Sequence, residues 1–229
     1  MKLTFLGSGA CFYPKLHNTS AYFTYNNNLI LLDCGETVYE RLLQCEDIAS
    51  YGQIYVVLTH LHADHVGSLG SLLSYCTCVL KKRIYVIYPN EQVCKLLSLL
   101  GIADDFYYYK KTLGNELEGL SVIPVKVSHA SDMECFGYEI QCGKSHIYYS
   151  GDASDIPEEI LVKFKSGEIQ TIHQDTSTHE SNSSSHMYVG KLEKKIPFEE
   201  RKRIVCMHLD SDCHKELEEK GFSTIEAFG

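Results

Sequence analysis

The sequence predicts an α/β fold in which two β-sheets pack face to face. Short apolar runs typical of strands alternate along the chain with longer segments typical of helices. Hydrophobic residues make up 44% of the 229 residues, which is ample for a core. Four of the strand-like runs are followed closely by histidine or aspartate, so we expect the sheets to gather these residues at one edge.

The composition favours one domain over residues 1–229 in a reducing, cytoplasmic compartment. Ten scattered cysteines without paired metal-finger spacing are typical of free thiols. The amino terminus lacks a signal-peptide pattern, and no run approaches the roughly 20 apolar residues of a membrane span, so no membrane partner is expected. A formal charge of −9 argues against a protein that coats nucleic acid by electrostatics.

The first half of the chain is expected to form strands and helices that lead into a histidine cluster. Three asparagines at 26–28 lie between two strand-like runs and indicate a hairpin, because asparagine tolerates left-handed backbone. The expected strands are 2–6, 21–25, 29–33, 54–58 and 84–88, and the expected helices are 36–45, 66–80 and 91–100.

The second half begins with strand-rich sequence and ends with helices. The expected strands are 106–109, 120–127, 137–141, 146–149 and 203–206, and the expected helices are 158–165, 185–195 and 214–220. Parallel strands that end on one edge of a sheet would bring residues distant in sequence into one site.

Residues 59–67, Thr-His-Leu-His-Ala-Asp-His-Val-Gly, hold three histidines and a carboxylate within six positions. In extended chain His60 and His62 project to the same side, so both imidazoles can meet one metal ion. Asp64 and His65 lie just past the expected turn and can face a second ion. A lone histidine beside a strand is usually a surface or core residue, but this density at this spacing favours metal binding.

Three later strand-like runs end in similar residues. Ser-His at 128–129, Ser-Gly-Asp at 150–152 and Met-His at 207–208 follow them in order. His129 or Asp152 alone would be an ordinary polar residue at a strand end. Taken with the cluster at 59–67, they resemble the ordered motifs of the metallo-β-lactamase superfamily, and this resemblance spans nearly the whole chain. It implies a four-layer αββα metallo-β-lactamase sandwich.

The opening of the chain is similar to one branch of that superfamily. Phe-Leu-Gly-Ser-Gly at 5–9, His-Asn-Thr-Ser at 17–20 and Leu-Asp-Cys-Gly-Glu at 32–36 resemble ribonuclease Z and related phosphodiesterases. The RNA-processing members carry a long RNA-gripping arm between the third-motif histidine and the bridging aspartate. Here only residues 130–151 separate His129 from Asp152, which is enough for two paired strands and no arm.

The resemblance implies a site with two divalent metal ions. The implied ligands are His60, His62 and His129 for one ion, Asp64, His65 and His208 for the other, and Asp152 between them. The paired imidazoles favour zinc, while manganese would suit the carboxylate-containing second site. Two such ions lower the pKa of a shared water towards about 7 and supply a bridging hydroxide as nucleophile. Asp33 could orient an imidazole from behind or only cap its loop.

A proton donor for the leaving group is expected in the polar tract 173–186. In the ribonuclease Z branch, a Glu-Ala-Thr element precedes a His-Ser-Thr helix start whose histidine donates the proton. Asp-Thr-Ser at 175–177 and His-Met-Tyr at 186–188 are similar, but the match departs with Asp for Glu and with Met-Tyr for Ser-Thr. The resemblance implies that His186 is the general acid and that Asp175 orients it, with Asp64 as a further catalytic residue. A serine-rich linker is the alternative.

These observations favour a dinuclear metal-dependent hydrolase that acts on a phosphodiester: a small molecule, a cyclic nucleotide or an RNA end. A carboxyl-ester-type hydrolase, such as a lactonase or thioesterase, would use the same ligands. A non-enzymatic binding module with a structural metal is the third alternative, although it would have little reason to keep all seven ligands. The resemblance also implies that a homodimer could form.

Overall fold

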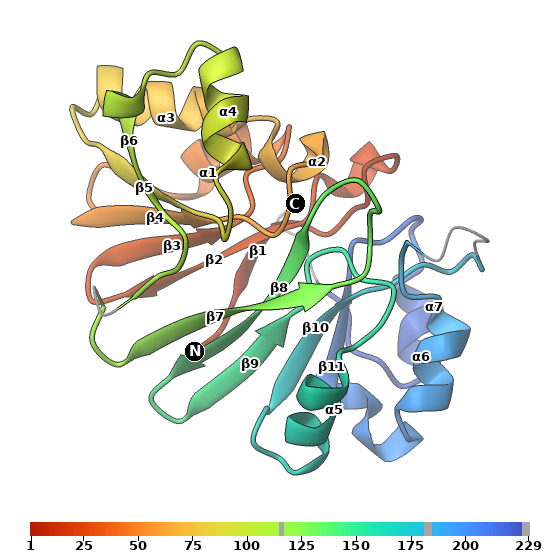
Figure 1. The fold of residues 1–229 in the computed structure, drawn as a ribbon. Helices are drawn as coiled ribbons and strands as arrows, with labels where there is room; N and C mark the ends of the chain where they lie inside the picture. Colours follow the sequence, from red (N-terminus) through yellow and green to blue (C-terminus); the bar gives the residue numbers. More distant parts are fainter. Residues whose placement is uncertain (115–116, 181–184, 226–229) are drawn as a thin grey trace.

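The computed structural model describes residues 1–114, 117–180 and 185–225, and it contains two β-sheets (Figure 1). The first sheet has six strands in sequence order. Its first three strands are antiparallel, and β3 to β6 run parallel to one another. The strands are β1 (Thr4–Gly7), β2 (Ser20–Tyr25), β3 (Asn28–Leu32), β4 (Gln53–Val57), β5 (Ile84–Ile87) and β6 (Tyr107–Lys110).

The second sheet has five strands in the order β11-β10-β9-β8-β7. The strands β9, β10 and β11 are parallel, whereas β7, β8 and β9 form an antiparallel meander. Their bounds are β7 (Leu120–Val127), β8 (Cys135–Cys142), β9 (Ser145–Tyr149), β10 (Thr171–Asp175) and β11 (Ile204–Met207). The segment between His129 and Asp152 thus consists of β8, β9 and their turns, as its length predicted.

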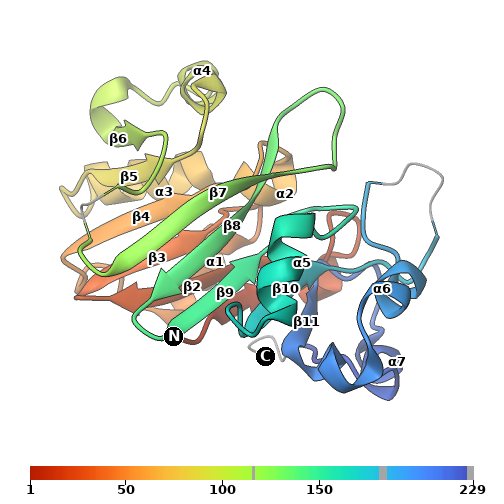
Figure 2. The same cartoon turned by 60° about the horizontal axis from the view of Figure 1, so that its bottom comes forward.

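Helices cover the outer face of each sheet (Figures 1 and 2). The helices α1 (Val38–Cys45), α3 (Leu69–Cys78) and α4 (Gln92–Leu99) lie over the first sheet, and α5 (Glu158–Lys165), α6 (Val189–Lys195) and α7 (His214–Glu219) lie beside the second. The remaining helical elements are α2 (Ala63–Val66), η1 (Pro14–Leu16), η2 (Asp104–Phe106) and η3 (Phe198–Arg203). This arrangement confirms the predicted four-layer sandwich.

The hydrophobic core explains why the parallel strands read as continuous apolar runs. Every residue from Leu29 to Leu32 is fully buried, as are Ile54, Val56 and Val57 of the neighbouring β4. Parallel strands with helices on one face and a second sheet on the other must be apolar on both sides. A second cluster of buried residues packs α5, α6 and α7 against β10 and β11.

The hairpin between β2 and β3 is confirmed. Tyr25 pairs with Asn28 at its closed end, and Asn26 and Asn27 have φ angles of 47° and 62°. Two consecutive left-handed residues form the turn whose twist matches that of the strands.

Three elements differ from the sequence prediction. The expected helix 66–80 begins only at Leu69, as α3, and the short helix α2 precedes it, because the Ser68 backbone N–H donates to the Cys34 carbonyl instead of to a carbonyl of α2. The expected helix 185–195 begins only at Val189. The tract 173–186 starts inside a strand, β10, that the sequence analysis did not predict; residues 181–184 of this tract lie outside the described residues. No helix in the described part of the chain is long and apolar enough to cross a membrane.

Candidate metal centre

All seven predicted metal ligands lie at the same edge of the sandwich, beyond the ends of strands. His60 and His62 follow β4, and α2 carries Asp64 and His65 directly after them. The other three ligands follow β7, β9 and β11 and are His129, Asp152 and His208, respectively. The parallel strands of each sheet end together, so residues as distant as 60 and 208 in sequence come within reach of one another.

The first group consists of His60, His62 and His129. Their ligand atoms lie within 4.8 Å of one another. Nδ1 of His62 is 2.9 Å from Nε2 of His60 and 3.2 Å from Nε2 of His129. Three imidazole nitrogens aimed at one point form the donor set of a catalytic zinc site with an open fourth position.

The second group consists of Asp64, His65, Asp152 and His208, all nearly fully buried. Asp64 Oδ2 lies 3.3 Å from Nε2 of His65 and 3.2 Å from Nε2 of His208. Asp152 joins the two groups. Its Oδ1 is 3.2 Å from Nε2 of His65, and its Oδ2 is 3.6 Å from Nε2 of His129.

The chemistry of these donors fits divalent metal ions. Two buried polar atoms, Nε2 of His65 and Oδ1 of Asp152, lie 3.2 Å apart, and neither has a partner with hydrogen-bond geometry among the described residues. Buried polar atoms almost always have a partner, so such a pair marks a site that something else completes. Imidazole nitrogens and carboxylate oxygens together are the ligands that zinc and related divalent ions take in proteins.

The electrostatics of the cluster also favour a cation. Burial raises the pKa of Asp64, but the hydrogen bond with His208 and the nearby His65 imidazole outweigh it and lower the pKa well below its usual range. Burial also lowers the pKa of His208, but Asp152, Asp175 and Asp64 raise it to about 10. The buried carboxylates therefore attract positive charge strongly, and a proton and a metal ion compete for the same imidazole.

The nitrogens of His60, His65 and His129 that face away from the cluster each have a partner. Nδ1 of His65 donates to Oδ2 of Asp33 over 2.9 Å, and the Thr59 hydroxyl donates to the same carboxylate. Thr59 Oγ1 lies 3.0 Å from Nδ1 of His60 and can accept from it. Nδ1 of His129 donates to the Ser185 carbonyl over 2.9 Å. Such partners fix which nitrogen faces the metal and how the ring is turned.

Asp33 thus orients the His65 imidazole, which is one of the two roles that the sequence left open for it. The role of Thr59 was missed, although the residue opens the motif at 59–67. Its backbone N–H and its hydroxyl both bond Asp33, so it ties the end of β4 to the end of β3. The position of this threonine directly before the His-x-His motif was the one sequence signal that could have indicated its role.

Replacing Asp33 with asparagine is expected to weaken metal binding by about 10- to 100-fold, because Nδ1 of His65 loses its charged acceptor. Competition with a fluorescent chelator measures this affinity. Glu139→Gln is the matched control, since Glu139 is a buried carboxylate 2.6 Å from Nε2 of His146, away from the cluster. An Asp33→Asn affinity equal to that of the control would contradict the orienting role.

His186 and Asp175 form a pair beside the seven ligands. Asp175 ends β10, and its Oδ2 accepts hydrogen bonds from Nδ1 of His186 over 2.7 Å and from the Ala153 amide over 3.0 Å. Its Oδ1 is 3.5 Å from Nδ1 of His208. Burial lowers the pKa of His186, but its hydrogen bond to Asp175 outweighs this effect and raises the pKa above its usual value. The imidazole is about one-third exposed, so it can meet a bound molecule.

Gly151 places Asp152 through a backbone conformation that side chains disfavour. Its φ is 57°, and a Cβ there would lie 2.7 Å from Cβ of Thr59. Only glycine fits such an approach at this φ.

Gly151→Ala is therefore expected to destabilise the fold by about 1–3 kcal/mol and to lower metal content, since Asp152 must move. Urea denaturation and metal analysis measure the two effects. Gly143→Ala is the matched control, because Gly143 has the same φ of 57° with nothing near its Cβ position. Equal losses in both variants would show that the left-handed strain alone is responsible and that contact with Thr59 contributes nothing.

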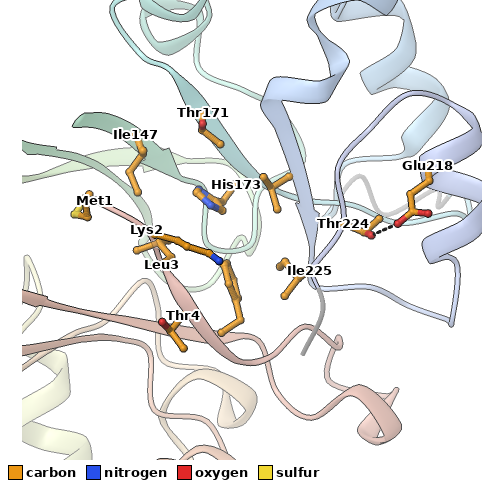
Figure 3. Close-up of a pocket in the computed structure, with 12 residues that line it drawn as sticks. Met1, Lys2, Leu3, Thr4, Ile147, Thr171, His173, Glu218, Thr224 and Ile225 are labelled. Atoms are coloured by element: carbon orange, nitrogen blue, oxygen red, sulfur yellow. Dashed lines mark hydrogen bonds between the residues drawn. The ribbon is translucent and has the colours of Figure 1, made fainter. Parts of the chain in front are cut away.

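A cavity of about 780 Å³ lies away from the metal cluster, between β1 and the second sheet (Figure 3). Thr171 at the start of β10 lines it, whereas Asp175 at the other end of the strand faces the cluster. His173 lies between these ends, and burial lowers its pKa to about 4, so it is neutral. The cavity contributes nothing to the seven-ligand site.

The two-sheet sandwich and the histidine–aspartate cluster at its edge define a class: metal-dependent hydrolases of the metallo-β-lactamase fold, with a ribonuclease Z-like motif set. Within it, the chain belongs to the family described as "Anti-Pycsar protein Apyc1", whose sequence pattern matches residues 1–227. The Apyc1 of Bacillus phage BSP38 is 27% identical over 231 residues, which cover 90% of this chain and 88% of that protein. A ribonuclease Z of Methanococcus maripaludis is 30% identical over 142 residues, which cover 61% of this chain and 45% of that enzyme.

Solved structures with the same fold confirm the sandwich. A diphosphatase of the PhnP family superposes with a TM-score of 0.74 at 22% identity, covering 98% of this chain and 94% of that one. The short form of human tRNase Z superposes with a TM-score of 0.73 at 19% identity, covering 100% of this chain and 98% of that one. Zinc-bound PqqB of Methylobacterium extorquens superposes with a TM-score of 0.72 at 14% identity, covering 99% of this chain and 98% of that one.

Proposed function

We propose that the protein is a dinuclear metal-dependent phosphodiesterase that acts on small phosphodiesters, cyclic nucleotides foremost. One observation carries this proposal. The seven clustered ligands lie next to a histidine–carboxylate pair, His186 and Asp175, that is placed to hand over a proton. Metal ligands alone would suit several hydrolases, whereas a phosphodiester also needs its leaving alkoxide protonated.

His60, His62 and His129 would hold one ion, and Asp64, His65 and His208 the other. Asp152 would be shared between them, because its carboxylate approaches imidazole nitrogens of both groups. Two divalent ions bound there would lower the pKa of a shared water and neutralise charge on the phosphoryl oxygens. Zinc is favoured by the three imidazoles of the first group, and manganese is compatible with the second.

The protein's own side chains would supply the charge that holds the ions and the proton for the leaving group. Asp64 and Asp152 bring negative charge that keeps the ions in place. Asp175 accepts from Nδ1 of His186, so the proton on the opposite nitrogen, Nε2, is the one available to the leaving oxygen. Because Asp175 also approaches Nδ1 of His208, it links the proton donor to the second metal group.

Three features support a small substrate over a long RNA. The two strands β8 and β9 occupy the chain between His129 and Asp152, where an RNA-gripping arm would be inserted. The formal charge of −9 disfavours binding of a polyanion by electrostatics. The family to which the chain belongs is named for an anti-Pycsar protein and not for a ribonuclease, which agrees with the absence of an arm at β8 and β9 and with the negative charge.

A substrate panel on the zinc- or manganese-loaded protein tests the proposal. We expect turnover of cyclic nucleotides and of base-free cyclic sugar phosphates, with slower or no cleavage of RNA carrying a 3′ extension. Lactones and thioesters complete the panel. Hydrolysis of these esters without any phosphodiester turnover would replace the proposal by the carboxyl-ester alternative, and a metal-loaded protein without any turnover would support a binding module.

A further inference from the structure

Phe12 stands at the tip of a tight, well-anchored turn. The Tyr13 amide donates to the Ala10 carbonyl over 2.9 Å, which closes a four-residue turn with Phe12 in its third position. The flanking residues are held as well, because the Gly9 amide donates to the His17 carbonyl over 2.8 Å. The turn therefore fixes the backbone from which the ring projects, and little backbone entropy would be lost when a ligand meets it.

This turn borders the metal cluster. The Ala10 amide donates to the carbonyl of Leu209, the residue after the ligand His208, over 2.9 Å. Burial raises the pKa of the Cys11 thiol, and the charges of Asp64 and Asp152 raise it further, so the residue before Phe12 lies within electrostatic reach of both carboxylates. The turn that leads into η1 lies beside α2, which carries Asp64 and His65 (Figure 1).

The phenyl ring itself is 96% exposed. Single exposed apolar residues are common, so exposure alone implies no function. Here the exposed ring combines with a rigid turn at the rim of a site that would hold a phosphodiester. A nucleotide whose phosphate lies at the metal ligands must direct its sugar and base outward, towards that rim.

We propose that Phe12 is the platform on which the nucleobase of the substrate stacks, and hence a residue that selects nucleotides over base-free phosphodiesters. This inference rests on the proposed phosphodiesterase function. Stacking on an aromatic face tolerates any base, because every base has a π-face. Phe12 would therefore favour cyclic nucleotides as a class without choosing among them.

Steady-state kinetics of the metal-loaded protein test this role. For a 3′,5′-cyclic nucleotide, Phe12→Ala and Phe12→Leu should raise KM by about 5- to 100-fold with kcat nearly unchanged, as expected when a base–aromatic stack is lost. Phe12→Trp should restore KM, because it keeps a π-face that leucine lacks. For ribose cyclic phosphate, which has no base, the same variants should leave KM unchanged.

Phe198→Ala is the matched control, since Phe198 is a 66%-exposed phenylalanine on η3, at the far end of β11 from His208. An equal rise of KM on both substrates, or no rise on the nucleotide, would overturn the role of Phe12 while hydrolysis of ribose cyclic phosphate still upheld the phosphodiesterase. A change of molecular mass in Phe12→Ala by light scattering would instead assign the ring to contact between copies. Wild-type protein that cleaves neither substrate would overturn both proposals.

Discussion

Replacing Asp152 with alanine is expected to remove at least one of the two metal ions and to lower phosphodiester turnover by about 10³-fold or more. The carboxylate lies within 4 Å of imidazole nitrogens from both ligand groups, so its loss breaks the only predicted bridge. Metal ions contribute several kcal/mol of transition-state stabilisation, and each 1.36 kcal/mol is a factor of ten in rate. Metal analysis after gel filtration and an assay with a cyclic nucleotide measure the two effects.

Asp155→Asn provides the control for that variant. Asp155 lies three positions further along the chain, is 41% exposed and pairs with Lys191 and Lys195 on α6. Its replacement should leave metal content and turnover at wild-type values. An Asp152→Ala protein that keeps two ions and full activity would show that the seven side chains are not one metal centre.

The fold was predictable because its motifs lie at the ends of strongly apolar strands. Each of the runs ending before His60, His129, Asp152 and His208 was recognisable by its apolar residues, and parallel strands must end on a common edge. The sequence order of the motifs therefore carried spatial information. The hydrogen-bond partners of the imidazole nitrogens that face away from the cluster could not be predicted from the sequence, because they depend on the geometry of the turn after each strand.

The strand β10 was missed because its sequence, Thr-Ile-His-Gln-Asp, has a single aliphatic residue. It forms by pairing with β9 on one side and β11 on the other, and its polar side chains are buried by the surrounding structure. Tertiary contacts override local propensity in such central strands. The consequence for the site is direct, because β10 ends at Asp175 and fixes that carboxylate between His186 and His208.

The left-handed conformations of Asp33 and His208, unlike those of the asparagine hairpin, were also beyond sequence reasoning. Asp33 and His208 have φ angles of 63° and 56°, although neither is glycine. Backbone in this region is strained for most side chains and concentrates at functional sites. Each residue follows the end of a buried strand and turns the chain sharply there. The turn directs the His208 side chain into the cluster and the Asp33 carboxylate to Nδ1 of His65.

Replacing His186 with alanine is expected to cut turnover of a cyclic nucleotide by about 10²- to 10⁴-fold while bound metal stays unchanged. The hydrogen bond that His186 donates to Asp175 raises the pKa of His186, so the protonated form dominates to higher pH than in a free imidazole. Because the acid form is required, wild-type kcat should fall as pH rises through that pKa. The variant should lose this alkaline decline.

The nature of the leaving group separates a proton donor from a structural residue. An aryl phosphodiester that releases a nitrophenolate needs little protonation, so His186→Ala should lose far less activity on it than on a cyclic nucleotide with an alkoxide leaving group. His214→Ala is the control, since His214 pairs with Asp212 at 2.9 Å outside the cluster. Equal losses on both substrates would assign His186 to positioning, and loss of metal would make it a ligand, as its position within 4.8 Å of His129 and Asp152 permits.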